Sequence, residues 1–167
     1  EGADYEEVLK EAQEKGYAER NPEADVEGYD ACRKIAILSS LISGQQVDFE
    51  DIYTEGITQI TKEDMMYAKA MGMTIKLLAC SRRDEDHIHA IVAPYPLSSS
   101  HPLYSVNDVF NAIFVHGNVL GDAMFYGSGA GKLPTASAVV ADVVDCVKHK
   151  GRNVMTLWSY EKLELGS

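Results

Sequence analysis

One short stretch of the chain gathers carboxylates and then ends in two bases. Within ERNPEADVEGYDACRK, residues 19–34, five acids precede Arg33 and Lys34. These acids are Glu19, Glu23, Asp25, Glu27 and Asp30. The stretch runs directly into IAILSSLI, an apolar segment typical of a buried helix face. Clustered carboxylates can bind a cationic amino group, and a lysine beside them can deliver a proton.

Asp30 and Lys34 are spaced at i and i+4, which places them on one face of a helix. Two interpretations stay open on this spacing. An exposed ion pair of this kind contributes only about 0.3–0.5 kcal/mol and need have no function. Because Lys34 adjoins the apolar segment, its ammonium could instead lie at the edge of the core. A partly desolvated lysine there would be a candidate proton donor, with burial lowering its pKa and the acids raising it.

A second feature is the series of alternate glycines in YGSGAGKLPTASAVVADV, residues 126–143. Gly127, Gly129 and Gly131 end a predicted strand just before a predicted helix, so a ligand could approach the backbone and an anion could lie at the helix start. The pattern is not a Walker A loop, because Tyr126 and Leu133 occupy positions where that loop needs Gly and Ser or Thr. A tight turn that needs glycine is an equally good interpretation.

The five histidines do not predict a metal site. His87 and His89 would share one face of a strand, but no third ligand lies near them in sequence. His101, directly before Pro102, is typical of a loop.

Composition limits the class of protein. The chain has 167 residues and a net charge of −11, which argues against binding to nucleic acid or to an anionic membrane. Three widely spaced cysteines predict buried, reduced thiols in a cytoplasmic protein. No apolar run is long enough to span a membrane. The chain begins without Met inside a charged helical pattern, so we expect a piece of a longer protein.

The elements that must position these residues follow from periodicity and from turn signals. Helices are predicted over residues 4–16, over 28–43 with Ala31, Ile35, Leu38 and Ile42 as the buried stripe, over 61–72 behind the capping pair Thr61 and Asp64, and over 134–151. Residues 17–28 are predicted to be a polar loop. Strands are predicted in MTIKLLACS and HIHAIVAPY, joined as a hairpin, and on both sides of Gly117-Asn118. The fold class is therefore α+β, or mixed α/β, with one largely antiparallel or mixed sheet covered by helices in a single domain over residues 1–167.

The residues also resemble a known family. KGYAERNPEADVEGYDACRKIAIL resembles the substrate-binding signature of homoserine dehydrogenase, G-Y-x-E-x-x-P-x-x-D-x-x-G-x-D-x-x-x-K. Further matches in the family's order are EGI at residues 55–57, IKLLA at 75–79, HPL at 101–103 and the glycine segment at 126–143. The resemblance extends from about Tyr5 to Val147.

The resemblance implies an NADPH- or NADH-dependent reduction of L-aspartate 4-semialdehyde to L-homoserine, in the pathway to threonine, methionine and isoleucine. It implies the substrate-binding and dimerisation domain of that enzyme, with a likeness to the monofunctional microbial forms. The Rossmann domain that holds most of the cofactor, and any C-terminal ACT domain, would lie outside this chain. A homodimer formed through the sheet is expected, and the rival interpretation is a dimerisation or scaffold module without catalysis.

The resemblance also assigns roles by motif. Glu19 and Asp30 would bind the substrate, chiefly its amino group, and Asp25 would lie close by. Lys34 would protonate the carbonyl oxygen. Gly16, Glu19 and Gly131 would lie at the cofactor. The family's second active-site lysine would lie in the part of the enzyme that precedes this chain.

Overall fold

The computed structural model describes residues 10–11, 13–14, 22–84 and 87–166 of the chain. The single domain expected over residues 1–167 comprises two compact units. The first, the core unit, contains Asn21–Met71, Ile75–Pro96 and Met155–Ser167. The second, the hairpin–helix unit, is chiefly Leu97–Val154 with Gly72–Thr74. The helix predicted over residues 4–16 lies largely outside the described residues.

A three-stranded sheet forms the centre of the core unit, in the order β1-β3-β2. Its strands are β1 (Tyr53–Thr54), β2 (Met73–Arg83) and β3 (Ile88–Ser98). Four residues join β2 to β3, a connection that only antiparallel neighbours allow, so the predicted hairpin is confirmed. The short β1 pairs with β3 in parallel, Tyr53 opposite Ile91, and the sequence did not predict it.

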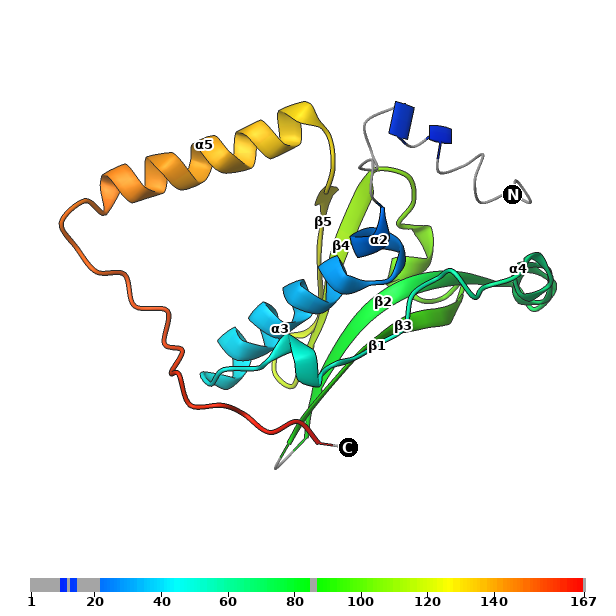
Figure 1. Ribbon diagram of the computed structural model, residues 1–167, viewed down its shortest axis with the longest axis horizontal. Coiled ribbons are helices and arrows are strands. Elements are labelled where there is room, and N and C mark those ends of the chain that lie inside the picture. Colours follow the sequence, from blue (N-terminus) through cyan, green and yellow to red (C-terminus); the bar gives the residue numbers. More distant parts are fainter. Residues whose placement is uncertain (1–9, 12, 15–21, 85–86, 167) are drawn as a thin grey trace. The chain divides into compact units, whose positions relative to one another are not determined.

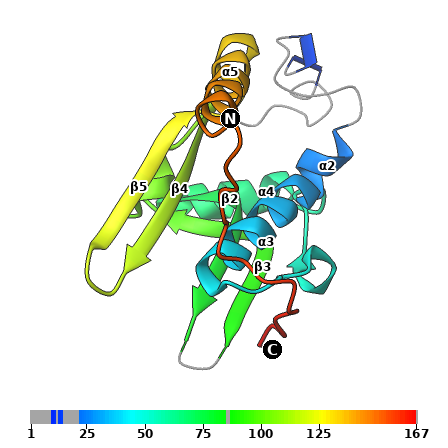
Figure 2. The ribbon, with the colours of Figure 1, turned by 90° about the vertical axis from the view of Figure 1, so that its left-hand side faces the viewer.

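Helix α3 (Tyr29–Ser43) lies along this sheet in both ribbon views (Figures 1 and 2). Cys32 and Ala36 of α3 and Val92 of β3 form a core with Val47 and Ile52, which lie between α3 and β1. The helix confirms the prediction over residues 28–43.

The predicted buried stripe of α3 was wrong by one position. Ile42 is 61% exposed, and Ala31 and Ile35 lie only at the margin of the core. The buried positions are Cys32, Ala36, Ser39 and Ser40. Small side chains on the buried stripe let the helix approach the sheet closely. A prediction based on large apolar residues therefore selects the neighbouring stripe, which carries them.

Three shorter elements complete the core unit. α2 (Glu23–Val26) occupies part of the segment predicted to be a polar loop, and η1 (Phe49–Asp51) follows α3. α4 (Lys62–Ala70) begins with the predicted capping box. The Thr61 hydroxyl accepts a hydrogen bond from the Asp64 amide, and the Asp64 carboxylate accepts one from the Thr61 amide.

The last residues of the chain return to the core unit. Gln46 pairs with Lys162 in a parallel bridge, and Leu163 and Leu165 pack against the core. The Trp158 indole donates a hydrogen bond of 3.0 Å to the Gln46 side chain. Lys162 contacts the Asp51 carboxylate at 2.8 Å, and this hydrogen bond raises the pKa of the ammonium. The segment from Met155 is thereby bound along the end of α3.

The hairpin–helix unit contains an antiparallel hairpin of β4 (Phe110–Gly117) and β5 (Gly121–Ser128), as predicted. Phe110 stacks on Tyr126 with ring centroids 4.8 Å apart. Ahead of the hairpin, η2 (Pro102–Ser105) has His101 as its N-cap, and the His101 ring accepts a hydrogen bond from the Leu103 amide. His101 therefore caps a turn.

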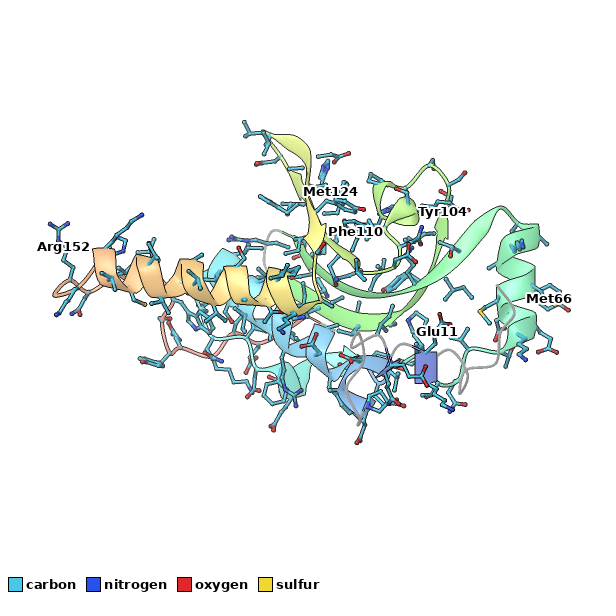
Figure 3. All side chains as sticks on the ribbon, turned by 90° about the horizontal axis from the view of Figure 1, so that it is seen from above. Glu11, Met66, Tyr104, Phe110, Met124 and Arg152 are labelled. Atoms are coloured by element: carbon cyan, nitrogen blue, oxygen red, sulfur yellow. The ribbon has the colours of Figure 1, made fainter. Side chains whose placement is uncertain are left out.

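Helix α5 (Lys132–Lys148) follows the hairpin, with Pro134 in its first turn as predicted. It ends at Lys148, three residues before the predicted end at Gly151. None of its residues is buried, although it carries several valines. Figure 3 shows its side chains projecting from the helix along its whole length.

The observed class is α+β, as predicted, with helices and two small sheets. One sheet had been expected across Met73 to Gly127, whereas the described strands form a three-stranded sheet and a separate two-stranded one. Buried thiols were expected, and this is correct for Cys32, but Cys80 is half-buried and Cys146 is exposed. Within the described ranges, no helix combines the length and the apolar character that crossing a membrane requires.

Candidate active site

The predicted site residues occupy the turn before α3 and the first turns of that helix. We call residues 22–28 the acidic turn: Pro22, the short helix α2 and Glu27-Gly28. Asp25 lies exposed on α2, and its amide donates to the Pro22 carbonyl oxygen at 2.9 Å. Gly28 then adopts φ = 79°, in the left-handed region, and α3 begins at Tyr29.

Asp30 and Lys34 are brought together by the helix. The Lys34 Nζ atom lies 2.6 Å from Asp30 Oδ2, one turn apart on α3. Their side chains are 69% exposed for Lys34 and 48% exposed for Asp30. The expected partial burial of Lys34 at the core margin is therefore wrong for this chain, because the residues that turn inward are Cys32 and Ala36.

Gly16 and Glu19, predicted at the cofactor and at the substrate, lie outside the described residues. Within the described part of the site, Asp25, Asp30 and Lys34 occupy consecutive turns of one continuous segment. Two carboxylates and one ammonium open to solvent can bind a zwitterionic amino acid and exchange a proton with it.

The glycine loop, residues 127–131, lies in the hairpin–helix unit. Gly131 has φ = 113°, a conformation that side chains rarely adopt, and it precedes α5 without a side-chain cap. A Cβ atom on Gly129 would overlap the side chain of Asn111. Both glycines are therefore required by the turn itself, and the uncapped amides at the start of α5 also suit an anionic group.

Two hollows on the described part of the surface are not lined by Asp25, Asp30, Lys34 or Gly131. One, of about 220 Å³, lies beside α3 and η1, and Arg33 there stacks over the Phe49 ring at 5.6 Å. A second, of about 430 Å³, is lined by residues of α5 alone, so it is a stripe on one helix. Among the described residues, no three His, Cys, Asp or Glu side chains are grouped to hold a metal ion. His89 instead contacts Asp84 at 2.9 Å.

Two features of the core unit were not predicted from the sequence. Gly56, quoted only as part of the EGI motif, packs directly against the acidic turn. Lys76, on β2, is a lysine whose pKa is lowered by burial. The packing of Gly56 against the acidic turn joins segments about thirty residues apart in sequence, so no local sequence pattern reveals it.

Comparison with known proteins places this geometry in a family. The family model for homoserine dehydrogenase matches residues 1–144. Homoserine dehydrogenase of Bacillus subtilis strain 168 is 50% identical over 145 residues, which is 87% of this chain and 34% of that protein. The Synechocystis enzyme is 50% identical over 151 residues, 88% of this chain and 35% of that protein. The chain thus spans about a third of the length of these relatives.

Solved structures agree. A homoserine dehydrogenase from Thiobacillus denitrificans superposes with a TM-score of 0.80 at 48% identity, covering 87% of this chain and 34% of that one. A hyperthermophilic archaeal homoserine dehydrogenase in complex with NADPH superposes with a TM-score of 0.63 at 26% identity, covering 88% and 41%. With its signature residues on the acidic turn and α3, this chain belongs to the homoserine dehydrogenase family.

Proposed function

We propose that the chain is the substrate-binding and dimerisation part of a homoserine dehydrogenase, which reduces L-aspartate 4-semialdehyde to L-homoserine with NADPH or NADH. The observation that carries the proposal is the Asp30–Lys34 pair at 2.6 Å, within a segment that matches the family signature residue by residue. Family membership supports the reaction, since the relatives are named for it.

Substrate recognition is assigned to the carboxylates. Glu19 and Asp30 bind the α-ammonium group of the substrate through charge-assisted hydrogen bonds, and Asp25 adds negative charge on the adjacent turn. Such bonds contribute about 1.5–3 kcal/mol each, more than neutral ones. These carboxylates thereby hold the amino acid at its charged end and leave its aldehyde free to react.

Lys34 is assigned as the general acid. Reduction places negative charge on the carbonyl oxygen, so an ammonium beside that oxygen stabilises the charge and donates the proton. Asp30 keeps Lys34 oriented through their contact. In the oxidation of homoserine the same lysine must accept a proton and therefore be neutral, so oxidation is favoured at alkaline pH.

The cofactor is a nicotinamide dinucleotide, which supplies the hydride when it is bound. Gly131, Gly16 and Glu19 are assigned to its nicotinamide end. The positive φ of Gly131 and the uncapped amides of α5 fit a ligand that approaches backbone and carries anionic charge. Most of the contacts that bind the dinucleotide are assigned to a Rossmann domain outside this chain.

A homodimer is proposed through the β4–β5 hairpin. Phe110, Ile113 and Met124 are at least 40% exposed there, and Phe125 is 68% exposed. Exposed apolar side chains gathered on one hairpin are typical of an interface. The cytoplasm is the proposed location, in keeping with three free thiols.

The test is an assay of the full-length protein that carries this chain, following NADPH oxidation with L-aspartate 4-semialdehyde. We expect turnover from the full-length protein and none from the 167-residue chain alone. The chain should form a dimer in light scattering and bind NADPH weakly in calorimetry. An inactive full-length protein would refute the proposed reaction. Sub-micromolar NADPH affinity of the chain alone would refute the assignment of most cofactor binding to a domain outside it. A monomeric chain would remove the dimer.

A further inference from the structure

The acidic turn is held in place by two positions that lack a side chain. The first is Gly28, which is buried; a Cβ atom there would lie 3.0 Å from a methyl of Val92 and 3.3 Å from the methyl of Thr54. The second is Gly56, where a Cβ atom would overlap the carbonyl oxygen of Val26 and lie 2.5 Å from Cα of Glu27. Distances this short leave no room for any side chain at residue 56.

The backbone next to Gly56 is also attached to the three-stranded sheet. Gly56 follows β1, whose residue Thr54 pairs with Val92 on β3. The next residue, Glu55, donates from its amide to the Val92 carbonyl oxygen at 2.8 Å. Val92 is fully buried in the core. The segment that carries residue 56 is therefore held rigidly to the sheet. A side chain at residue 56 would displace the acidic turn and leave this segment in place.

The contact joins backbone to backbone, which makes it stiff. The Ile57 amide donates a hydrogen bond of 2.8 Å to the same Val26 carbonyl oxygen that lies against Gly56. A flexible side chain could rotate away from an added methyl group, but a carbonyl oxygen held by a hydrogen bond cannot do so without moving its peptide. Displacement of Val26 passes directly to Asp25, its neighbour on α2.

We propose that Gly56 is a positioning residue for substrate recognition: by lacking a side chain, it sets the distance of the acidic turn from β1 and so the place of Asp25, the carboxylate that the proposed function puts beside the substrate's ammonium group. The inference rests on the proposed function. It adds that the recognition site is built by two segments, the acidic turn and residues 53–57.

Lys34 lies beyond the reach of this displacement. Between it and the acidic turn, Cys32 is buried in the core. Ala36, on the next turn, is buried as well. The helix is thus anchored where Lys34 is attached. A shift of the acidic turn should weaken substrate binding and leave proton transfer nearly intact.

The test is Gly56→Ala in the full-length protein, with KM for L-homoserine and kcat measured together with the melting temperature. We expect KM to rise about tenfold and kcat to stay within about threefold, since misplaced binding groups act on the ground state and the transition state alike. Gly117→Ala is the matched control, because a Cβ atom there meets nothing nearer than 3.8 Å. It should leave KM unchanged.

Gly28→Ala is the second variant, and it stands in if Gly56→Ala does not fold. It disturbs the same turn where a Cβ atom meets side-chain methyl groups at 3.0 Å or more and not the backbone atoms that it would overlap at Gly56, so KM should rise by less than in Gly56→Ala. Unchanged KM in a folded variant of either kind, with wild-type protein active, would overturn the inference and leave the proposed function standing. A fall of kcat and of melting temperature at constant KM would assign Gly56 to folding alone and overturn it too. An inactive wild-type protein would refute both together.

Discussion

The core unit and the hairpin–helix unit differ in where their apolar side chains lie. In the core unit, α3 and the three-stranded sheet bury Cys32, Ala36 and Val92 between them. In the hairpin–helix unit, α5 buries none of its residues, and Val139, Val143 and Val147 are each more than half exposed. Of the buried apolar residues in the described part of the chain, only Leu97 belongs to the hairpin–helix unit.

The two units are therefore suited to different roles. A unit with its own core can hold side chains at fixed places, and Asp25, Asp30 and Lys34 of the proposed site are in that unit. A helix with apolar residues on a bare face is marginally stable alone, because helical stability comes mostly from packing. Because the chain spans about a third of the length of its relatives, we propose that α5 is covered in the full-length protein. The predictions below test this contrast, from the largest expected effect to the smallest.

Lys34→Met in the full-length protein should lower kcat by about 100-fold, the scale of general acid catalysis, because Met keeps the apolar stem and removes the proton. Steady-state kinetics measure it. Lys69→Met is the control, an exposed lysine of α4 in the same unit, and it should leave kcat unchanged. A Lys34→Met enzyme with more than half of wild-type turnover would restore the interpretation of Asp30–Lys34 as a surface ion pair.

Val92→Ala should lower the free energy of unfolding of the 167-residue chain by about 2 kcal/mol, since it removes buried methyl groups and leaves a cavity. Val92 is fully buried, whereas Val143 is 57% exposed. The matched substitution Val143→Ala should change the free energy by less than about 0.5 kcal/mol. Urea unfolding followed by circular dichroism compares the two. Equal effects would show that α5 is packed in the isolated chain and that the contrast between the units is wrong.

Asp30→Asn should raise KM for L-homoserine about tenfold in the full-length protein, because it removes the charge of one hydrogen-bond acceptor without changing its shape. Asp122→Asn is the matched control. Asp122 also contacts a base, His116, at 2.6 Å, and is exposed, but it lies on β5 in the other unit. If Asp30→Asn binds substrate as well as the wild type and the control do, the Asp30 carboxylate is a solvated surface charge.

The alkylation rates of the three cysteines should differ between the two units. At pH 8, exposed Cys146 on α5 should react first in the isolated chain. Burial raises the pKa of the Cys80 thiol, so Cys80 should react more slowly and gain rate as the pH rises. Buried Cys32, whose thiol contacts the Phe49 carbonyl oxygen at 3.4 Å, should react last. Mass spectrometry follows each site. In the full-length protein Cys146 should be protected, and equal reactivity there would mean that α5 stays uncovered.

The elements that the sequence predicts well are those with long local signals. The 15-residue α3, the hairpin around Gly117 and the capping box at Thr61 each follow from spacing within one segment. The two-residue β1 and the four-residue α2 do not, because both are too short for a periodic signal and β1 exists only through its pairing with β3.

The candidate site divides in the same way. The contact between Asp30 and Lys34 follows from helical spacing and was predicted, although the partial burial of Lys34 was not observed. The support that Gly56 gives to the acidic turn joins segments about thirty residues apart. Such a contact is fixed by tertiary packing, so it becomes visible only when both backbones are placed.

The chain contains a single tryptophan, and the fold places it where it can be used. Trp158 is half-buried, and its indole donates to Gln46, just beyond the end of α3. Release of the segment from Met155 would transfer that indole into water, which shifts its emission to longer wavelength. Intrinsic fluorescence therefore reads the attachment of this segment directly, without a label. A phenylalanine at residue 158 would leave the remaining optical signal to the nine tyrosines.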